Sequence, residues 1–168
     1  MLKIINNLKP FFEDCYRRIS VREYSKILKV SPPTASKILN RYYKEGLLKM
    51  EKDRNYLFFY AERENKVFIQ LSRMYWSYSL GEMVDYLNKA LLSPTIILFG
   101  SLSKGEAKKD SDVDIAVFAN KKELNIKKFE KKLGRKIQIF WFKYFNEVKE
   151  DIKNNIINGH VIEGKIKI

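Results

Sequence analysis

The pattern of apolar and polar positions in the first 61 residues predicts two short helices followed by a β-hairpin. Apolar residues recur at helical spacing from Val21 to Leu28 and again from Ala35 to Tyr42. Two apolar-rich runs then flank a polar tip, Lys52 to Asn55, where the chain must reverse. The helix boundaries are signalled by a Ser20–Glu23 capping box for the first helix and by Ser31, Pro32 and Gly46 for the second.

Residues 62–94 have a helical pattern that is rich in aromatic side chains. We expect Gly81 to interrupt this helix and Pro94 to close the segment. For three of its aromatic residues, core packing is favoured over stacking on a base: Tyr75, Trp76 and Tyr78. The change of pattern places a domain boundary near residue 61, which gives a domain over residues 1–61 and a second over residues 62–168 that includes the connecting helix.

The second domain alternates short apolar strands with helical segments, which is typical of a mixed α/β layer. Residues 121–134 have a basic, helix-like pattern that ends at Gly134, and a further helix ends near Ile157 before a turn and a C-terminal strand. The basic helix is expected mainly to solvate the surface, with a wider nucleic-acid footprint as the alternative. Three strands are expected in one sheet: Thr95–Phe99, Val113–Phe118 and Lys136–Phe142.

Composition limits the class of protein. With 168 residues, 45% of them hydrophobic, the chain can bury an ordinary core, and it has neither a membrane-length apolar run nor a signal-peptide pattern. We therefore expect a cytoplasmic protein that does not enter a membrane. The only cysteine, Cys15, excludes an internal disulfide and is expected to be a buried small hydrophobe. A formal net charge of +13 favours polyanionic partners, although lysine-rich surfaces also arise without them.

The candidate residues for a phosphate and metal site lie in residues 97–118, ILFGSLSKGEAKKDSDVDIAVF. Residues i and i+2 of a strand point to the same face, so Asp112 and Asp114 present two neighbouring carboxylates. Such a pair, together with phosphate oxygens and water, is a ligand set that Mg²⁺ accepts. Gly100 and Ser101 follow the preceding apolar strand, where a glycine permits a sharp turn and the close approach of a phosphate. The alternative is ordinary core strands joined by a turn at Asp110–Asp112.

These residues resemble the minimal nucleotidyltransferases of the DNA polymerase beta superfamily, whose signature is Gly-Ser, a short helix and Asp-x-Asp on the next strand. The resemblance also includes Gly105. It implies that Gly100, Ser101 and Gly105 bind a nucleoside triphosphate, with ATP expected, and that Asp112 and Asp114 are catalytic ligands of Mg²⁺ or Mn²⁺. Family members usually supply a third carboxylate from a later strand. Here that catalytic position is Gln138, and an amide cannot take up a proton; Glu130 and Glu123 are the alternative acids.

Helix, short turn, helix and hairpin in this order resemble a winged helix-turn-helix of transcription regulators. The predicted fold class is therefore α+β, a winged helix-turn-helix followed by a small mixed-sheet nucleotidyltransferase domain. Residues 1–61 carry 13 Lys or Arg against 6 Asp or Glu. We expect duplex DNA as a partner, with protein contacts or homodimerisation as the alternative. The expected DNA-binding residues are Thr34, Ser36, Lys37, Asn40, Arg41, Lys44, Lys52 and Arg54.

Two classes of function are compatible with these patterns. The first is a nucleotidyltransferase related to the small partners of toxin–antitoxin pairs, some of which adenylylate a hydroxyl of a toxin-like protein. The second is a DNA-binding or partner-binding regulator whose nucleotidyltransferase domain no longer turns over. Gln138 distinguishes the two, because loss of the third acid affects proton transfer more than nucleotide binding.

Overall fold

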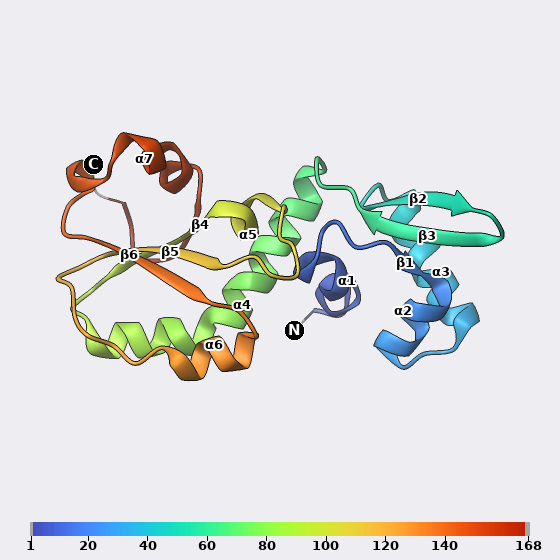
Figure 1. Ribbon diagram of the computed structural model, residues 1–168, viewed down its shortest axis with the longest axis horizontal. Coiled ribbons are helices and arrows are strands. Elements are labelled where there is room, and N and C mark those ends of the chain that lie inside the picture. Colours follow the sequence, from blue (N-terminus) through green and yellow to red (C-terminus); the bar gives the residue numbers. More distant parts are fainter. Residues whose placement is uncertain (1, 167–168) are drawn as a thin grey trace. The chain divides into compact units, whose positions relative to one another are not determined.

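The computed structural model describes residues 2–166, which divide into two compact units (Figure 1). The first unit contains residues 1–75 and 105–109, and the second contains residues 76–104 and 110–168. The division therefore falls at Tyr75, inside a long helix, and not near residue 61 as the sequence pattern predicts. Aromatic packing explains the difference, because Phe68 and Tyr75 lie 5.1 and 5.7 Å from Phe12, measured between ring centroids.

The first unit contains the two helices and the hairpin that the sequence predicts. Ser20 accepts a hydrogen bond from the backbone N–H of Glu23, and Ser31 accepts one from Thr34, so both predicted N-caps are present. The three strands form an antiparallel sheet in the order β1-β3-β2. Helix α1 and the two-residue strand β1 have no counterpart in the sequence prediction. The elements are α1 (Lys3–Glu13), β1 (Ile19–Ser20), α2 (Val21–Leu28), α3 (Pro32–Lys44), β2 (Leu48–Asp53) and β3 (Tyr56–Ala61).

A chain of buried polar groups connects α1, α2 and α3 in this unit. The Tyr24 hydroxyl donates to the Asn7 carbonyl at 2.8 Å, and the Asn7 side-chain amide donates to the Tyr42 hydroxyl at 3.0 Å. Burial raises the pKa of Tyr24, and the neighbouring Tyr42 adds to the rise. Because each buried polar group has a partner, the network specifies how α1, α2 and α3 pack rather than destabilising the core. Cys15 is buried, as predicted.

Helix α4 (Lys66–Ala90) runs without a break through Gly81, so the predicted interruption is wrong. A glycine inside a helix costs about 1 kcal/mol relative to alanine, but burial of apolar side chains on both sides of it, such as Leu80 and Met83, outweighs that cost. Tyr75 and Trp76 are core residues, as favoured, whereas Tyr78 is exposed. Within residues 2–166, no helix combines the length and apolar character needed to cross a bilayer.

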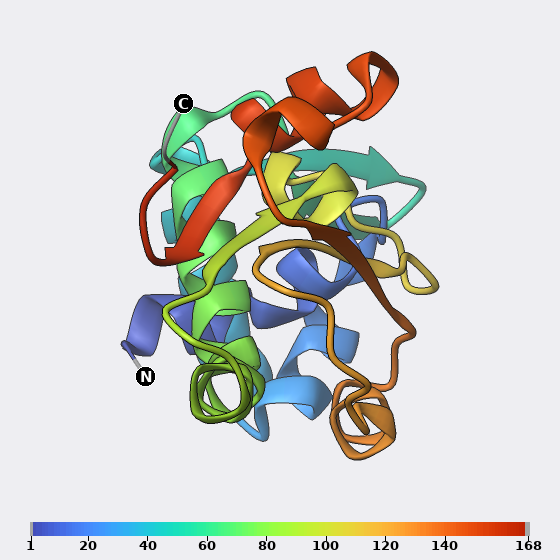
Figure 2. The same ribbon diagram turned by 90° about the vertical axis from the view of Figure 1, so that its left-hand side faces the viewer.

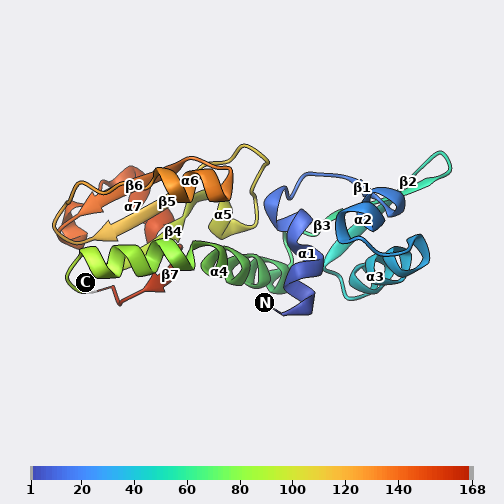
Figure 3. The same cartoon turned by 90° about the horizontal axis from the view of Figure 1, so that it is seen from below.

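The second unit contains a four-stranded sheet in the order β6-β5-β4-β7, in which β5 and β6 are parallel and the other pairs antiparallel. The three expected strands are present in one sheet, and the C-terminal strand joins them. Helices α4 and α6 lie over one face and α7 over the other (Figures 1 and 3). Beyond α4, the elements are β4 (Thr95–Phe99), α5 (Gly100–Lys104), β5 (Val113–Phe118), α6 (Lys127–Leu133), β6 (Ile137–Phe142), η1 (Phe145–Glu147), α7 (Glu150–Ile157) and β7 (His160–Glu163).

Two predicted helices of this unit are shorter than expected. Residues 121–126 are not helical, and α6 begins only at Lys127, where Phe129 supplies its buried contact. The segment before Ile157 is divided into η1 and α7 by Val148, which is extended and buried in the core. In both cases an apolar anchor fixes the position of the helix, and the basic or polar residues around it do not extend the helix.

Candidate active site

One face of the sheet changes from apolar to acidic along β5. Phe118, Ala116 and Asp114 alternate onto the same face, and Asp112 continues it just before the strand begins. The apolar part packs under α7 in a core that contains Ala116, Ile97 and Ile156. The carboxylates therefore lie where the core of this face ends, at the N-terminal end of β5.

Strand pairing gives Asp114 its two neighbours. Asp114 is opposite Phe99 of the antiparallel strand β4 and opposite Gln138 of the parallel strand β6. Gly100 follows Phe99 directly and has a φ of +71°, in the left-handed region that favours glycine. A Cβ at Gly100 would collide with the Asp114 carboxylate. The Gly-Ser turn and the Asp-x-Asp strand, ten residues apart in sequence, are thus brought into direct contact.

The electrostatic environment of the two aspartates favours a cation. Burial raises the pKa of the Asp114 carboxyl, and the negative charge of Asp112 raises it further. The Gln138 side chain donates from Nε2 to Asp112 Oδ2 at 2.6 Å, which places an amide dipole beside the carboxylate pair. A divalent ion would reduce the repulsion between the two carboxylates and offset the desolvation of Asp114.

The donor set fits Mg²⁺ or Mn²⁺ but is small. Within residues 2–166 there is no cluster of three or more His, Cys, Asp or Glu side chains suited to a metal. Mg²⁺ is commonly held by one or two carboxylates together with waters and substrate phosphates, so Asp112 and Asp114 are sufficient protein ligands. The Gln138 amide donates its N–H to Asp112, and its side-chain oxygen is a further neutral oxygen donor beside the carboxylate pair.

Arg135 supports the turn that carries Asp112, and the sequence analysis missed it. Its guanidinium donates from Nη1 to the Ser111 carbonyl at 2.6 Å and lies 5.1 Å from the centroid of the Trp76 ring. The residue is buried, so its charge is placed close to the acidic turn at the cost of desolvation. The sequence feature that could have indicated this role is an arginine between a helix-ending glycine and an apolar strand.

Glu130, an alternative third acid, accepts a hydrogen bond from the Ile137 backbone N–H at 2.9 Å.

Helix α5 joins the Gly-Ser turn to α7. The Ser103 hydroxyl donates to the Gly100 carbonyl at 2.9 Å, and Lys104 Nζ donates to Asn155 Oδ1 at 2.9 Å. Ser101 is half-buried beside the turn. Gly105 follows α5 with a φ of +71°, and an added Cβ there would meet Ile69 at 3.2 Å, so the residue is closely packed within the first unit.

The residues predicted to contact DNA lie on α3 and at the hairpin tip. Asn40 donates from Nδ2 to the Ser36 carbonyl at 2.9 Å, and these two side chains are half-buried. Arg41 donates from Nε to Glu45 Oε1 at 2.7 Å and is thus partly neutralised. The other predicted contacts are exposed: Thr34, Lys37, Lys44, Lys52 and Arg54. On α3, Lys37, Arg41 and Lys44 therefore recur at helical spacing, and Arg41 is paired with Glu45.

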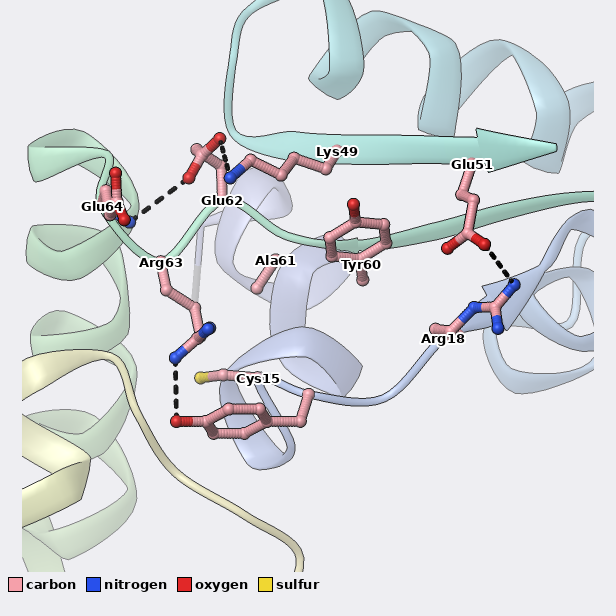
Figure 4. A pocket seen from close by; sticks show the side chains of 10 residues that line it. Cys15, Arg18, Lys49, Glu51, Tyr60, Ala61, Glu62, Arg63 and Glu64 are labelled. Carbon is pink, nitrogen blue, oxygen red and sulfur yellow. Dashed lines mark hydrogen bonds and ion pairs between the residues drawn. The ribbon is translucent and has the colours of Figure 1, made fainter.

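A separate cavity of about 280 Å³ lies in the first unit, where the chain leading to β1 passes the end of β3 (Figure 4). Its lining contains three basic and three acidic residues, and four of these six form two ion pairs. Arg18 bonds Glu51 at 3.2 Å, and Lys49 bonds Glu62 at 3.0 Å. Arg63 donates to the Tyr16 hydroxyl at 2.8 Å. None of the lining residues belongs to the Asp-x-Asp region, and the balanced rim gives no charge preference for a ligand.

Comparison with protein families agrees with this geometry. The family model described as a nucleotidyltransferase domain matches residues 81–165, just over half of the chain, and this span includes Gly100, Asp112, Asp114 and Gln138. No curated protein matches the chain significantly. On the strength of the family match, the chain belongs to the nucleotidyltransferase domain family.

Proposed function

We propose that the second unit binds a nucleoside triphosphate as its Mg²⁺ or Mn²⁺ complex. The observation that carries the proposal is the contact between Gly100 and Asp114, with Asp112 on the same face and Gln138 hydrogen-bonded to it. ATP is the proposed nucleotide. The raised pKa of Asp114 supports the proposal, because a site that holds two close carboxylates at a cost in stability gains most from a bound cation.

Each residue then has a defined task. Gly100 lets the turn pass closely over the Asp114 carboxylate, and the Ser101 hydroxyl and nearby backbone N–H groups hold a phosphate beside it. Asp112 and Asp114 hold the divalent ion, which supplies positive charge against the negative charge that develops on the transferred phosphoryl group. Arg135 and Trp76 keep the turn at Ser111 in place, so that the two carboxylates stay aligned.

Gln138 sets the rate of any transfer. An amide at this position binds Asp112 but cannot accept the proton of an attacking hydroxyl. We propose slow nucleotidyl transfer with nucleotide binding retained, and a hydroxyl of a partner protein as the acceptor, by resemblance to antitoxin-type enzymes. The second candidate, a regulator whose nucleotidyltransferase domain binds nucleotide without turnover, is favoured by the same Gln138–Asp112 bond.

The proposed role of the first unit is binding of duplex DNA as a winged helix-turn-helix. Helices α2 and α3 followed by the β2–β3 hairpin support it, as do the exposed cations Lys37, Lys44, Lys52 and Arg54. In this arrangement α3 enters the major groove and the hairpin tip contacts the backbone. The chain would then combine a DNA-binding unit with a nucleotide-binding one.

Calorimetric titration of the full chain with ATP and Mg²⁺ tests the nucleotide proposal. We expect binding by the parent and its loss in the double variant Asp112→Asn, Asp114→Asn. The control Asp110→Asn, Asp151→Asn removes the same charge from two exposed positions outside the strand face. Equal binding by the Asp112/Asp114 variant and the parent would show that the site has been misplaced.

A further inference from the structure

A second concave site lies at the opposite end of the sheet of the second unit. A cavity of about 400 Å³ opens where α4 ends and where β5 and β6 leave the sheet, the end that faces the viewer in Figure 2. Residues from three segments meet there: the end of α4, the loop after β5 and the loop after β6. They are Ala90, Leu91, Leu92, Ala119, Asn120, Lys121, Lys122, Lys143 and Tyr144.

The charged side chains that line this cavity are all positive, and one of them, Lys122, donates from Nζ to the Ala90 carbonyl at the end of α4 at 3.3 Å. Three lysines line the cavity, Lys121, Lys122 and Lys143, and no lining residue is acidic. Among residues 2–166, none of the three takes part in an ion pair, in contrast to Lys132, which pairs with Glu82. The nearby Glu147 carboxylate accepts the backbone N–H of Lys143 at 2.7 Å. Three close ammonium groups around a concavity attract an anion more strongly than the same groups spread over a flat surface.

Apolar and aromatic groups lie beside these lysines. Tyr144 is 59% exposed and Leu92 is 95% exposed, so both present apolar surface to solvent at the cavity rim. Lys143 Nζ lies 5.4 Å from the centroid of the Tyr144 ring. An exposed ring with a cation beside it is the arrangement on which an unpaired base stacks while its phosphate meets the ammonium group.

We propose that this cavity binds single-stranded nucleic acid, with a base on Tyr144 and the apolar wall and with backbone phosphates on the three lysines. The cavity volume suits one nucleotide, and a base can enter only when it is free of a duplex. The strand β5 separates this cavity from Asp112. At about 3.3 Å per residue the separation is about 25 Å, so one nucleotide cannot occupy both places.

Fluorescence anisotropy with the full chain tests the proposal. The probes are labelled twelve-nucleotide oligo-dT and oligo-U, with excess unlabelled duplex present to occupy any duplex-binding surface. We expect the variant Lys121→Gln, Lys122→Gln, Lys143→Gln to bind at least tenfold more weakly. Its affinity should also depend less on salt, with the log–log slope smaller by about 2, since each phosphate contact of a single strand contributes about 0.7. Tyr144→Ala should lose about tenfold, and Tyr144→Phe should bind like the parent.

A matched variant controls for net charge. Lys131→Gln, Lys149→Gln, Lys165→Gln removes three exposed lysines that do not line the cavity, and we expect it to retain most of the affinity. An equal loss in this control would overturn the proposal, as would competition by unlabelled duplex that abolishes probe binding, or equal displacement by poly-glutamate. An oligonucleotide that carries 5-iodouracil should crosslink to Tyr144, and mapping of the crosslink only to other segments would also overturn it.

Discussion

Gln138 donates its side-chain N–H to Asp112 Oδ2 at 2.6 Å, although the two residues are 26 positions apart in the chain. The bond joins the start of β6 to the residue that precedes β5, at the open end of the carboxylate face. A carboxylate at position 138 would instead place a third negative charge beside Asp112 and Asp114. In the absence of a cation, the amide is therefore the better neighbour for this pair.

The first prediction concerns Gln138→Glu, which keeps the side-chain length and restores an acid. We expect transfer of label from radiolabelled ATP to rise by about 10²- to 10⁴-fold, the usual contribution of a positioned general base. Nucleotide affinity should change much less. Gln138→Ala serves as the control, since it removes the Asp112 bond without adding an acid. A parent that already turns over well, with no gain in the Glu variant, would show that another group activates the acceptor.

The second prediction concerns the pH dependence of stability. Burial and the charge of Asp112 raise the pKa of Asp114 in the fold, so the ionised form is disfavoured relative to the unfolded chain. This penalty is fully present above the folded pKa and disappears as the pH falls below the unfolded value, about 3.9. Asp114→Asn should therefore raise Tm at pH 7 and leave it unchanged near pH 3. Mg²⁺ should raise the Tm of the parent and not that of the variant.

A surface aspartate provides the comparison for this experiment. Asp85 is exposed on α4, and Asp85→Asn should leave Tm nearly unchanged at both pH values. If Asp114→Asn lowered Tm at pH 7, the carboxylate would be stabilising the fold through contacts of its own, and the electrostatic account of the site would be wrong.

The third prediction compares two glycines in the same backbone conformation. Gly100 has a φ of +71° and Gly134 a φ of +65°, so alanine at either position costs about 1–2 kcal/mol of backbone strain. Only at Gly100 would the new methyl group also collide with Asp114, whereas nothing lies within 4 Å of a Cβ at Gly134. Thermal unfolding should show both variants destabilised, and calorimetry should show loss of MgATP binding in Gly100→Ala alone. Normal binding by Gly100→Ala would exclude a requirement for that contact.

Much of the candidate site could be predicted because its parts are local. The i, i+2 spacing of Asp112 and Asp114 places both side chains on one face of the strand. The Gly-Ser turn can be recognised because it directly follows an apolar strand. Strand pairing is not local, and Arg135 illustrates the consequence: its contacts with Ser111 and Trp76 join residues 24 and 59 positions apart. No periodic pattern in the sequence indicates such a contact.

Errors in the fold prediction arise where packing outweighs local preference. The sequence pattern predicts an interruption of the helix at Gly81, yet α4 continues through it because the residues around it are buried. The boundary expected near residue 61 moves to Tyr75 because Phe68 and Tyr75 pack against Phe12.

The fourth prediction concerns Arg135 as a positioning residue. Arg135→Met keeps an apolar body beside Trp76 but removes the hydrogen bond to the Ser111 carbonyl. We expect a stability loss of about 1–3 kcal/mol, the usual result of leaving a buried polar group unpaired. MgATP affinity should fall as well, whereas Lys132→Met, which breaks the exposed bridge to Glu82, should leave it unchanged. If the Arg135→Met variant were as stable as the parent and bound MgATP with the same affinity, Arg135 would have no positioning role in the site.

The last prediction tests the first unit as a DNA-binding module, and it follows from the ion pair between Arg41 and Glu45. The full chain is the right material, because a fragment of residues 1–61 would lack Phe68 and Tyr75, which complete the core of this unit.

Lys37→Ala should weaken binding to duplex DNA and reduce the salt slope by about 0.9, the value expected for one phosphate contact. Glu45→Gln should have the opposite effect, because it frees Arg41 to contact a phosphate. The pair is exposed and contributes little to stability, so the fold should persist. Glu106→Gln, an equal charge change at another exposed position of the same unit, separates the local effect from net charge. Anisotropy titrations at several salt concentrations measure all three, and equal gains from Glu45→Gln and Glu106→Gln would show that α3 holds no preferred contact with DNA.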